Sequence, residues 1–347
     1  MSSELSLISR PDQWDISEKD FPKNEGITRK LRFIINYAIL APSSHNSQPW
    51  LFKIVNSMIE LHADMTRAIP IVDPEDRELI ISCGAALFNL RLALRRFGYT
   101  SAVDLFPNPG VPDLLARVRI GENVVEAEDE HYLLFEAITK RHTNRMPFEK
   151  KKVPEEVLSE LRAMAAVEGC WLNIVEGEDY RNALADLIAE GDHIQGANRQ
   201  FRRELAAWVH PNRTRSHDGM PGYSLGMGDI ASYAGPLIIR TFDWGKGQAA
   251  KDRQLAAGSP VLAVLGSDAE TPAAWLKTGQ ALERVLLRAQ AANVSASYLN
   301  QPIEVPDLRT RVHDLLKRNG YPQLILRMGY GHEPKPTPRR PVSEVLL

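Results

Sequence analysis

The chain has 347 residues, of which 44% are hydrophobic and 25% are charged, and its 42 basic and 44 acidic residues give a net charge of -2. This length allows about two domains, and this composition permits a sizeable buried core. The near-neutral charge excludes a general electrostatic attraction to nucleic acid or to anionic membranes, and no apolar run approaches the roughly 20 residues that span a bilayer.

The cysteines and the first residues indicate the compartment. Cys83 and Cys170 are too few for a disulfide framework and lie in apolar contexts, so both are expected to be buried and reduced. Residues 1–15, MSSELSLISRPDQWD, contain neither the basic nor the apolar region of a signal peptide. We therefore expect a cytoplasmic protein.

The first part of the chain alternates helix-like and strand-like patterns. In chain order, the expected elements are a helix at 27–41, strands at 50–55 and 58–63, a long helix at 77–97 and a strand at 113–120. Pro42 ends the first helix, and Gly84 permits a close backbone approach on the long helix.

The same ingredients recur in the same order later in the chain. The expected elements there are a helix at 154–166, strands at 170–175 and 259–267, a helix at 275–293 and a strand at 322–331. Aligning Gly84 with Gly279 places Leu92 over Leu287, and the later stretch PDLLARV has its own match in PQLILRM. These ordered matches favour an ancestral duplication, with a first copy at 1–125, a second copy at 126–347 and a boundary in the polar stretch EAEDEHY.

The second copy carries an insertion at about 208–258, which includes HPNRTRSHDGMPGYSLGMGD. Its Gly, Pro, Ser and Asn content predicts a long loop. A loop of this length in a compact domain is often a lid or binding loop, and a surface excursion is the alternative.

Residues 42–50, PSSHNSQPW, are the first candidate for binding chemistry. This turn presents backbone N–H groups with Ser and Asn side chains, which can match the donors and acceptors of a flat heterocycle. The alternative is a turn whose side chains bond only to the turn itself.

Residues 141–145, RHTNR, are the second candidate, and 338–341, PRRP, are the third. Two arginines, an imidazole and a hydroxyl can hold a phosphate dianion through charge-assisted bonds, whereas the alternative is a solvated basic run. In PRRP, prolines fix the backbone around two fork-shaped cations, and the alternative is an ordinary tail. The chain has no dinucleotide-binding GxGxxG, P-loop or GxSxG motif, and its histidines lack metal-ligand spacing, so no metal is expected.

With these segments in place, the chain resembles the FMN-dependent nitroreductase family. PSSHNSQPW matches the family's PSxxNxQPW segment, RHTNR its R-[RH]-S-x-[RK] segment, and PRRP its basic C-terminal stretch. The resemblance extends over most of the chain. It implies an α+β fold of two tandem nitroreductase-like domains that form a pseudo-dimer, each a mainly antiparallel sheet flanked by helices.

In that family two identical subunits intertwine, and each flavin takes contacts from both. Here PSSHNSQPW lies in the first copy, and no segment like R-[RH]-S-x-[RK] precedes it. RHTNR begins the second copy, where AAVEGCW stands in place of a second PSxxNxQPW. Each copy has kept the half that the other lost, so the resemblance implies a single FMN site, as in the single-chain, Acg-like branch.

The resemblance also assigns roles to residues. Arg141 and Thr143 would bind the FMN phosphate, assisted by Arg339 or Arg340, and His142 would lie near the phosphate and ribityl chain. Arg145 would lie near N1 and the C2 carbonyl of the ring, where positive charge favours the anionic reduced flavin. Four residues of the other copy would line the ring: Pro42, Ser43, Ser44 and Asn46.

One position departs from the family pattern. Members usually place a Glu-Gly pair against the ring after the long C-terminal helix, whereas this chain has Asn300 and Gln301. The departure replaces a carboxylate with amides near N5 and C4 of the flavin.

The resemblance implies an NAD(P)H oxidoreductase that passes electrons through FMN to a nitroaromatic or quinone-like acceptor, with no catalytic side chain because flavin N5 carries the chemistry. Alternatives are a non-catalytic protein that sequesters FMN beneath a lid, and a cofactor-free paralogue. A monomer with a pseudo-dimeric fold is sufficient, and a homodimer is the other possibility.

Overall fold

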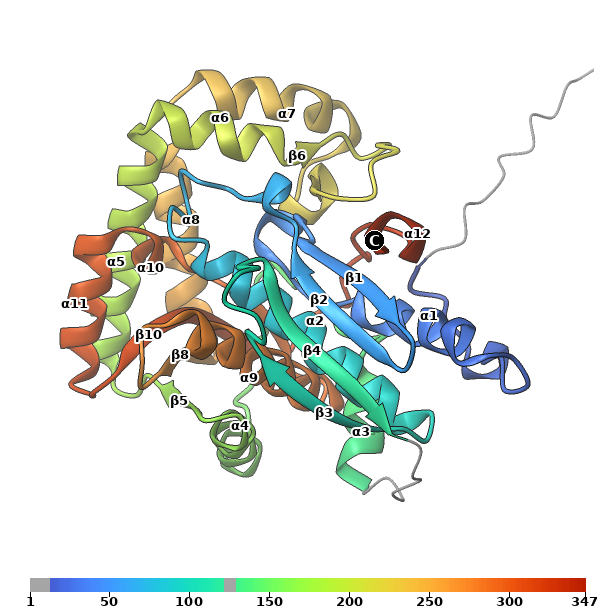
Figure 1. The fold of residues 1–347 in the computed structure, drawn as a ribbon. Helices are drawn as coiled ribbons and strands as arrows, with labels where there is room; N and C mark the ends of the chain where they lie inside the picture. Colours follow the sequence, from blue (N-terminus) through green and yellow to red (C-terminus); the bar gives the residue numbers. More distant parts are fainter. Residues whose placement is uncertain (1–12, 122–128) are drawn as a thin grey trace, which may run out of the picture.

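A computed structural model describes residues 13–121 and 129–347. These residues form two four-stranded sheets with helices around them, so the predicted α+β class is confirmed (Figure 1). The predicted domain boundary near residue 125 lies outside the described residues, as does most of the segment that was compared with a signal peptide. None of the described helices is long and apolar enough to cross a membrane.

The first half follows the predicted order of elements. It contains η1 (Glu18–Asp20), α1 (Ile27–Ala38), η2 (Ser44–Asn46), β1 (Trp50–Val55), β2 (Met58–Ala63), η3 (Met65–Arg67), α2 (Arg77–Arg96), β3 (Thr100–Leu105) and β4 (Leu114–Gly121). The sheet order is β1-β2-β4-β3, and all neighbouring strands are antiparallel. Strand β3 was not predicted, because its residues lie at a half-exposed sheet edge and carry no clear apolar alternation.

The second half repeats this arrangement. It contains α3 (Asp129–Ala137), α4 (Glu155–Val167), β5 (Cys170–Ile174), β8 (Val261–Ser267), α9 (Pro272–Ala291), β9 (Ser295–Tyr298), α10 (Gln301–Glu304), α11 (Pro306–Leu316), β10 (Tyr321–Gly329) and α12 (Val342–Val345). Its sheet order, β5-β8-β10-β9, is again antiparallel throughout. In both sheets the strands run first, second, fourth, third in chain order, with the long helix between the second and the third.

The segment between β5 and β8 corrects the prediction of a long loop at 208–258. It contains α5 (Glu178–Ala197), α6 (Arg199–Ala207), β6 (Val209–His210), β7 (Met220–Pro221), η4 (Gly222–Leu225), α7 (Asp229–Thr241) and α8 (Gly245–Gly258). Only about the first 20 residues of the expected loop are largely irregular. Glycine and proline content was misleading here because α7 accommodates Pro236 and α8 begins and ends at glycine.

The two long helices α2 and α9 cross through a reciprocal pair of glycines. A Cβ atom on Gly84 would lie 2.2 Å from the carbonyl oxygen of Leu276, and one on Gly279 would lie 1.9 Å from that of Ile81. A shift of 195 positions (Gly84 to Gly279) therefore also relates Ile81 to Leu276. This two-way contact is what a two-fold interface between equivalent surfaces produces.

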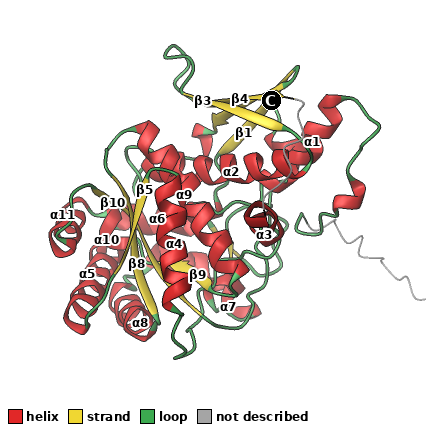
Figure 2. Ribbon diagram, turned by 90° about the horizontal axis from the view of Figure 1, so that it is seen from below, coloured by secondary structure: helices red, strands yellow, loops and turns green. Residues whose placement is uncertain are grey.

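Both sheets pack on this helix pair, which lies between them (Figure 2). One apolar cluster joins α1, α2, α9 and residues from both sheets. The second sheet is covered on its other face as well, by residues of α5 and α11, which explains why every residue of β8 is buried. The two halves thus share one core, and the surfaces next to the helix crossing are fixed relative to each other.

Candidate functional site

A cavity of about 590 Å³ lies where the two halves meet beneath the inserted helices. This volume is in the range of small-molecule sites. Seven predicted site residues line it: Pro42, Ser43, Ser44, Thr143, Arg145, Asn300 and Gln301. The other five, which are Asn46, Arg141, His142, Arg339 and Arg340, are not among its lining residues.

The segment 42–50 enters the cavity with an unusual backbone. His45, Asn46 and Gln48 have φ angles of 54°, 56° and 53°, which is the left-handed region that non-glycine residues rarely occupy. Such conformations persist only when surrounding contacts impose them, and they cluster at functional sites. The Oγ atom of Ser43 accepts a hydrogen bond from the backbone N–H of Gln48 (2.9 Å), and Ser44 donates to Glu78 (2.6 Å).

The insertion and the C-terminal tail hold this backbone in place. The amide nitrogen of Asn46 donates to the carbonyl oxygens of Gly219 (2.9 Å) and Pro338 (3.0 Å), and its oxygen accepts from Arg339 (2.8 Å). Gln48 accepts from the backbone N–H of Arg340 at 2.8 Å. These bonds use both polar atoms of the Asn46 side chain. Asn46 therefore positions the site, and it does not line the cavity, although the sequence analysis expected it to line the ring.

Replacing Asn46 with alanine is expected to lower the free energy of unfolding by about 2–4 kcal/mol, since it removes three buried hydrogen bonds from a left-handed residue. Urea denaturation measures this. Asn56→Ala is the matched control, because Asn56 has φ 54° but is exposed in the β1–β2 turn, and it should cost only about 1 kcal/mol. Equal losses in the two variants would show that the side-chain bonds of Asn46 contribute nothing.

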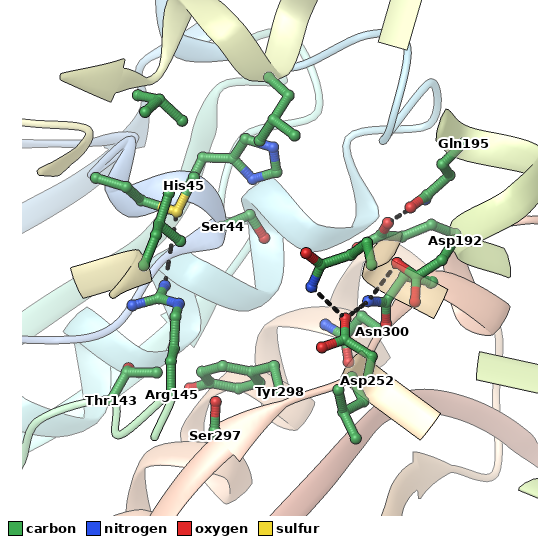
Figure 3. A pocket seen from close by; sticks show the side chains of 18 of the residues that line it. Ser44, His45, Thr143, Arg145, Asp192, Gln195, Asp252, Ser297, Tyr298 and Asn300 are labelled. Carbon is green, nitrogen blue, oxygen red and sulfur yellow. Dashed lines mark hydrogen bonds between the residues drawn. The ribbon is translucent and has the colours of Figure 1, made fainter. Parts of the chain in front are cut away.

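Arg145 extends into the cavity without an acidic partner (Figure 3). Its guanidinium contacts the Sδ atom of Met220 at 3.6 Å, and no carboxylate in residues 13–121 and 129–347 lies within ion-pair distance of it. Burial lowers its pKa, opposed by Tyr298. His45 lies nearby and is held neutral, because burial and then Arg145 lower its pKa to about 4. The cavity wall therefore carries a cation that nothing in the described chain neutralises.

A second concentration of positive charge lies beside the cavity, around Arg141 and Arg339. Arg141 donates to the carbonyl oxygen of Leu40 (3.1 Å), and its Nε lies 3.5 Å from the carboxylate of Glu283. The Nε atoms of both arginines are buried without a hydrogen-bond partner. Burial and then Arg141 lower the pKa of Arg339 to about 9, while burial raises that of Glu283 to about 6. Two guanidiniums thus face a single, easily protonated carboxylate, which suits an anion.

Thr143 connects these two regions, since it lines both the large cavity and a small gap that it shares with Arg141, His142 and Tyr298. The segment is fixed in place because the backbone N–H of Asn144 donates to the carbonyl oxygen of Ala296 at 2.9 Å. The polar segment 141–145 therefore runs from the charged cluster into the cavity.

The remaining predicted residues have other partners. Arg340 lies 3.3 Å from Asp64 and donates to the carbonyl oxygens of Gln48 and Glu344, so it fixes the tail and does not reach the cavity. His142 packs edge-on against Trp14 with ring centroids 4.3 Å apart. Burial, followed by Arg141 and Arg339, lowers the pKa of His142 to about 3, so it adds no charge.

Asn300 and Gln301 are both held by hydrogen bonds to the protein. The oxygen of Asn300 accepts from the backbone N–H of Ile325 at 2.9 Å. Gln301 donates to Asp192 (3.1 Å) and Asp252 (2.8 Å). Both residues line the cavity, at the turn that follows β9.

The equivalent place in the other half is a pocket of about 220 Å³ with a carboxylate of the protein beside it. The 195-position shift relates Leu286, Gln290, Val294 and Ala296 of the small gap to Arg91, Arg95, Tyr99 and Ser101, which line a separate pocket. There the carboxylate of Glu168, from the stretch AAVEGCW, lies 3.1 Å from Arg91 and 3.3 Å from Arg284. An internal carboxylate thus occupies the surroundings that correspond to the positive cluster.

Several lining residues were missed by the sequence analysis, among them His45, Glu78, Asp192, Asp252, Ser297 and Tyr298. Tyr298 lies two residues before Asn300, so inspection of that stretch could have identified it. Asp192 and Asp252 carry no local signal, because they come from two separate helices, α5 and α8, and meet only in the folded chain. In the described residues, no group of three or more His, Cys, Asp or Glu side chains is arranged to hold a metal ion.

Comparisons with known proteins place these features in context. No family model matches the chain. It is 31% identical to a Mycobacterium tuberculosis protein named as the NAD(P)H nitroreductase Rv3131, over 94% of this chain and 92% of the relative. Identity to the NAD(P)H nitroreductase PigM of Serratia sp. is 24%, over 93% and 94%. Among solved structures, the FMN-dependent nitroreductase NfnB of Mycobacterium smegmatis in complex with NADPH is 17% identical, with a TM-score of 0.41 over 62% of this chain and 97% of that chain.

Proposed function

The chain belongs to the NAD(P)H nitroreductase family, and we propose that it is an oxidoreductase that holds one FMN in the cavity between its halves and takes electrons from NAD(P)H. The acceptor would be a small nitroaromatic or quinone-like molecule. FMN, when bound, supplies the chemistry by accepting a hydride and passing the electrons on. The residues of the chain bind, orient and exclude water.

The observation that carries this proposal is Arg145. A guanidinium that lines a cavity without a carboxylate partner fits an electron-rich ligand edge, and the N1–C2 edge of a flavin is such an edge. Positive charge at that edge also favours electron uptake by the ring. Pro42, Ser43 and Ser44 would lie along the ring from the first half, and Asn300 and Gln301 from the second half.

We assign the phosphate to the cluster of Arg141 and Arg339, with the hydroxyl of Thr143 at its entrance. The support is the pair of buried guanidiniums, whose Nε atoms donate no hydrogen bond, beside one carboxylate. Arg339 is preferred over Arg340 because Arg340 is already paired with Asp64. His142 would contact the phosphate end as a neutral ring.

A single site per chain follows from the unequal halves. The first half supplies 42–50, the second supplies 141–145, and Glu168 already pairs with two arginines at the counterpart of the positive cluster. We attribute the two halves to a duplication, with a first copy at 1–125 and a second at 126–347. The insertion at 208–258 would act as the lid, because α7 and α8 both contribute side chains to the cavity wall. Its apolar side chains would exclude water from the ring.

Removing the charge of Arg145 tests the site. Arg145→Met is expected to weaken FMN binding by about ten- to a hundredfold, the loss that accompanies removal of hydrogen bonds made by a charged group. Arg145→Lys keeps the positive charge but not the fork-shaped guanidinium, and it should lose less affinity for FMN than Arg145→Met. Flavin fluorescence titration measures both. Arg240→Met, at an exposed position of α7, is the control and should bind as the unaltered protein does. Wild-type affinity in Arg145→Met would remove the main support for the site.

A further inference from the structure

Two buried carboxyl groups face each other in the cavity, away from Arg145 (Figure 3). Asp192 comes from α5 and is 2% exposed, and Asp252 comes from α8 and is 5% exposed. The amide nitrogen of Gln301 bridges them, donating to Oδ1 of Asp192 at 3.1 Å and to Oδ2 of Asp252 at 2.8 Å. Both carboxyls line the space that a substrate would enter.

This pair lacks the donors that buried carboxyls usually have. Oδ2 of Asp192 is buried and receives no bond from an N–H group of the described chain; its carboxyl bonds to that of Asp252 when one of the two is protonated. Asp252 accepts a second bond, from Gln248 at 2.9 Å. Asp73, another buried acid, is by contrast bonded by the backbone N–H of Leu79 at 2.9 Å. The reliance of Asp192 on a shared proton therefore distinguishes the pair from a carboxyl that only stabilises the fold.

The protonation state of the pair favours the binding of a cation. Burial, and then Asp252, raise the pKa of Asp192 to about 8, so the two groups share a proton at neutral pH. Burial also raises the pKa of Asp252. It outweighs the bonds from Gln248 and Gln301 and the positive charges of Lys251 and Arg327, all of which lower that pKa. A ligand with positive charge and N–H donors could replace the shared proton.

We propose that Asp192 and Asp252 form a subsite for an organic cation with at least two N–H donors, such as a protonated amine or amidine on an aromatic ring. Two N–H groups of one cation can reach both carboxyls, while the ring lies against apolar residues such as Leu255 and Leu299. The inference rests on the proposed function, because it names the substrate class of the same cavity: aromatic acceptors that carry a cationic group opposite Arg145.

Calorimetry with benzamidine and its neutral analogue benzamide tests the subsite on the purified protein with added FMN. Titrations at pH 7 in two buffers of different ionisation enthalpy count the protons released. We expect benzamidine to bind more tightly than benzamide and to release about one proton at pH 7 and none at pH 9. Since the cation displaces the proton, its affinity should rise roughly tenfold per pH unit up to about pH 8 and then level off.

Variants locate the effect. Asp192→Asn and Asp252→Asn are each expected to weaken benzamidine binding at least tenfold at pH 9 and to reduce proton release at pH 7, because only one carboxyl remains and its pKa is raised by burial alone. Asp186→Asn, on the exposed side of the same helix, is the matched control and should change neither value. Equal binding of benzamidine and benzamide at pH 9, or binding of benzamidine without proton release at pH 7, would overturn the proposal. Both measurements use the unaltered protein, so they do not depend on whether the variants fold.

The same samples separate this proposal from the proposed function. Flavin absorption reports FMN binding independently of the calorimetric signal. Benzamidine binding without retained flavin would support the subsite and refute the FMN site. Retained flavin with no preference for benzamidine over benzamide would support the FMN site and refute the subsite.

Discussion

The Arg339→Met variant is expected to lose roughly tenfold or more of the preference for FMN over riboflavin, with the remainder supplied by Arg141. In the unaltered protein FMN should bind roughly a hundredfold or more tightly than riboflavin, because riboflavin lacks the phosphate that Arg141 and Arg339 would hold and charge-assisted bonds contribute about 1.5–3 kcal/mol each. Methionine keeps much of the apolar volume of the arginine stem and removes its fork-shaped cation. Titrations of both flavins against both proteins measure the effect.

The comparison of two ligands separates the phosphate from the rest of the site. The affinity for riboflavin should hardly change in Arg339→Met, since no ring contact is assigned to Arg339. A matched loss of affinity for both flavins would mean that Arg339 acts by holding Asn46, which accepts its hydrogen bond at 2.8 Å, and not by binding phosphate. An unchanged preference for FMN would place the phosphate elsewhere.

The second large effect concerns the helix crossing. Gly279→Ala is expected to destabilise the protein by about 3 kcal/mol or more, at the upper end of overpacking costs. A Cβ at this position would lie 1.9 Å from the backbone oxygen of Ile81, and a backbone atom cannot rotate away as a side chain can. Because α2 and α9 join the two halves, FMN binding should weaken with the stability.

Two further alanine variants control this prediction. Gly84→Ala should match Gly279→Ala, since its Cβ would meet the oxygen of Leu276 at 2.2 Å in the reciprocal contact. Gly258 is exposed at the end of α8 with no neighbour within 4 Å of a Cβ, so Gly258→Ala should be neutral or stabilising by about 0.4–1 kcal/mol. Thermal denaturation of the three variants gives the order. Similar melting temperatures for Gly279→Ala and Gly258→Ala would contradict the tight crossing.

The sequence predicted elements well where burial is one-sided or complete. Helices α1, α2 and α9 repeat apolar residues on one face, and β8 is a continuous apolar run, so periodicity located them. Strand β3 was missed because an edge strand needs no apolar face. Helix α7 was missed because several of its apolar side chains face outward, with Ile230 90% exposed, so no buried stripe marks it.

The candidate site shows a similar division. Segments 42–50 and 141–145 were predictable because each gathers its chemistry within a few residues. The sequence could not choose between Arg339 and Arg340, since only the fold pairs Arg340 with Asp64. It also could not find Asp192 with Asp252, or Arg141 with Glu283, because those contacts join elements far apart in the chain.

The central claim is that the two halves build one flavin site and that the flavin accepts electrons from NAD(P)H. Counting FMN per chain after saturation and removal of excess, followed by anaerobic addition of NADH or NADPH, tests both parts in one sample. The account predicts one FMN per chain and loss of the flavin absorption with at least one of the two nucleotides. No retained flavin, two flavins per chain, or bound flavin that neither nucleotide bleaches would contradict it.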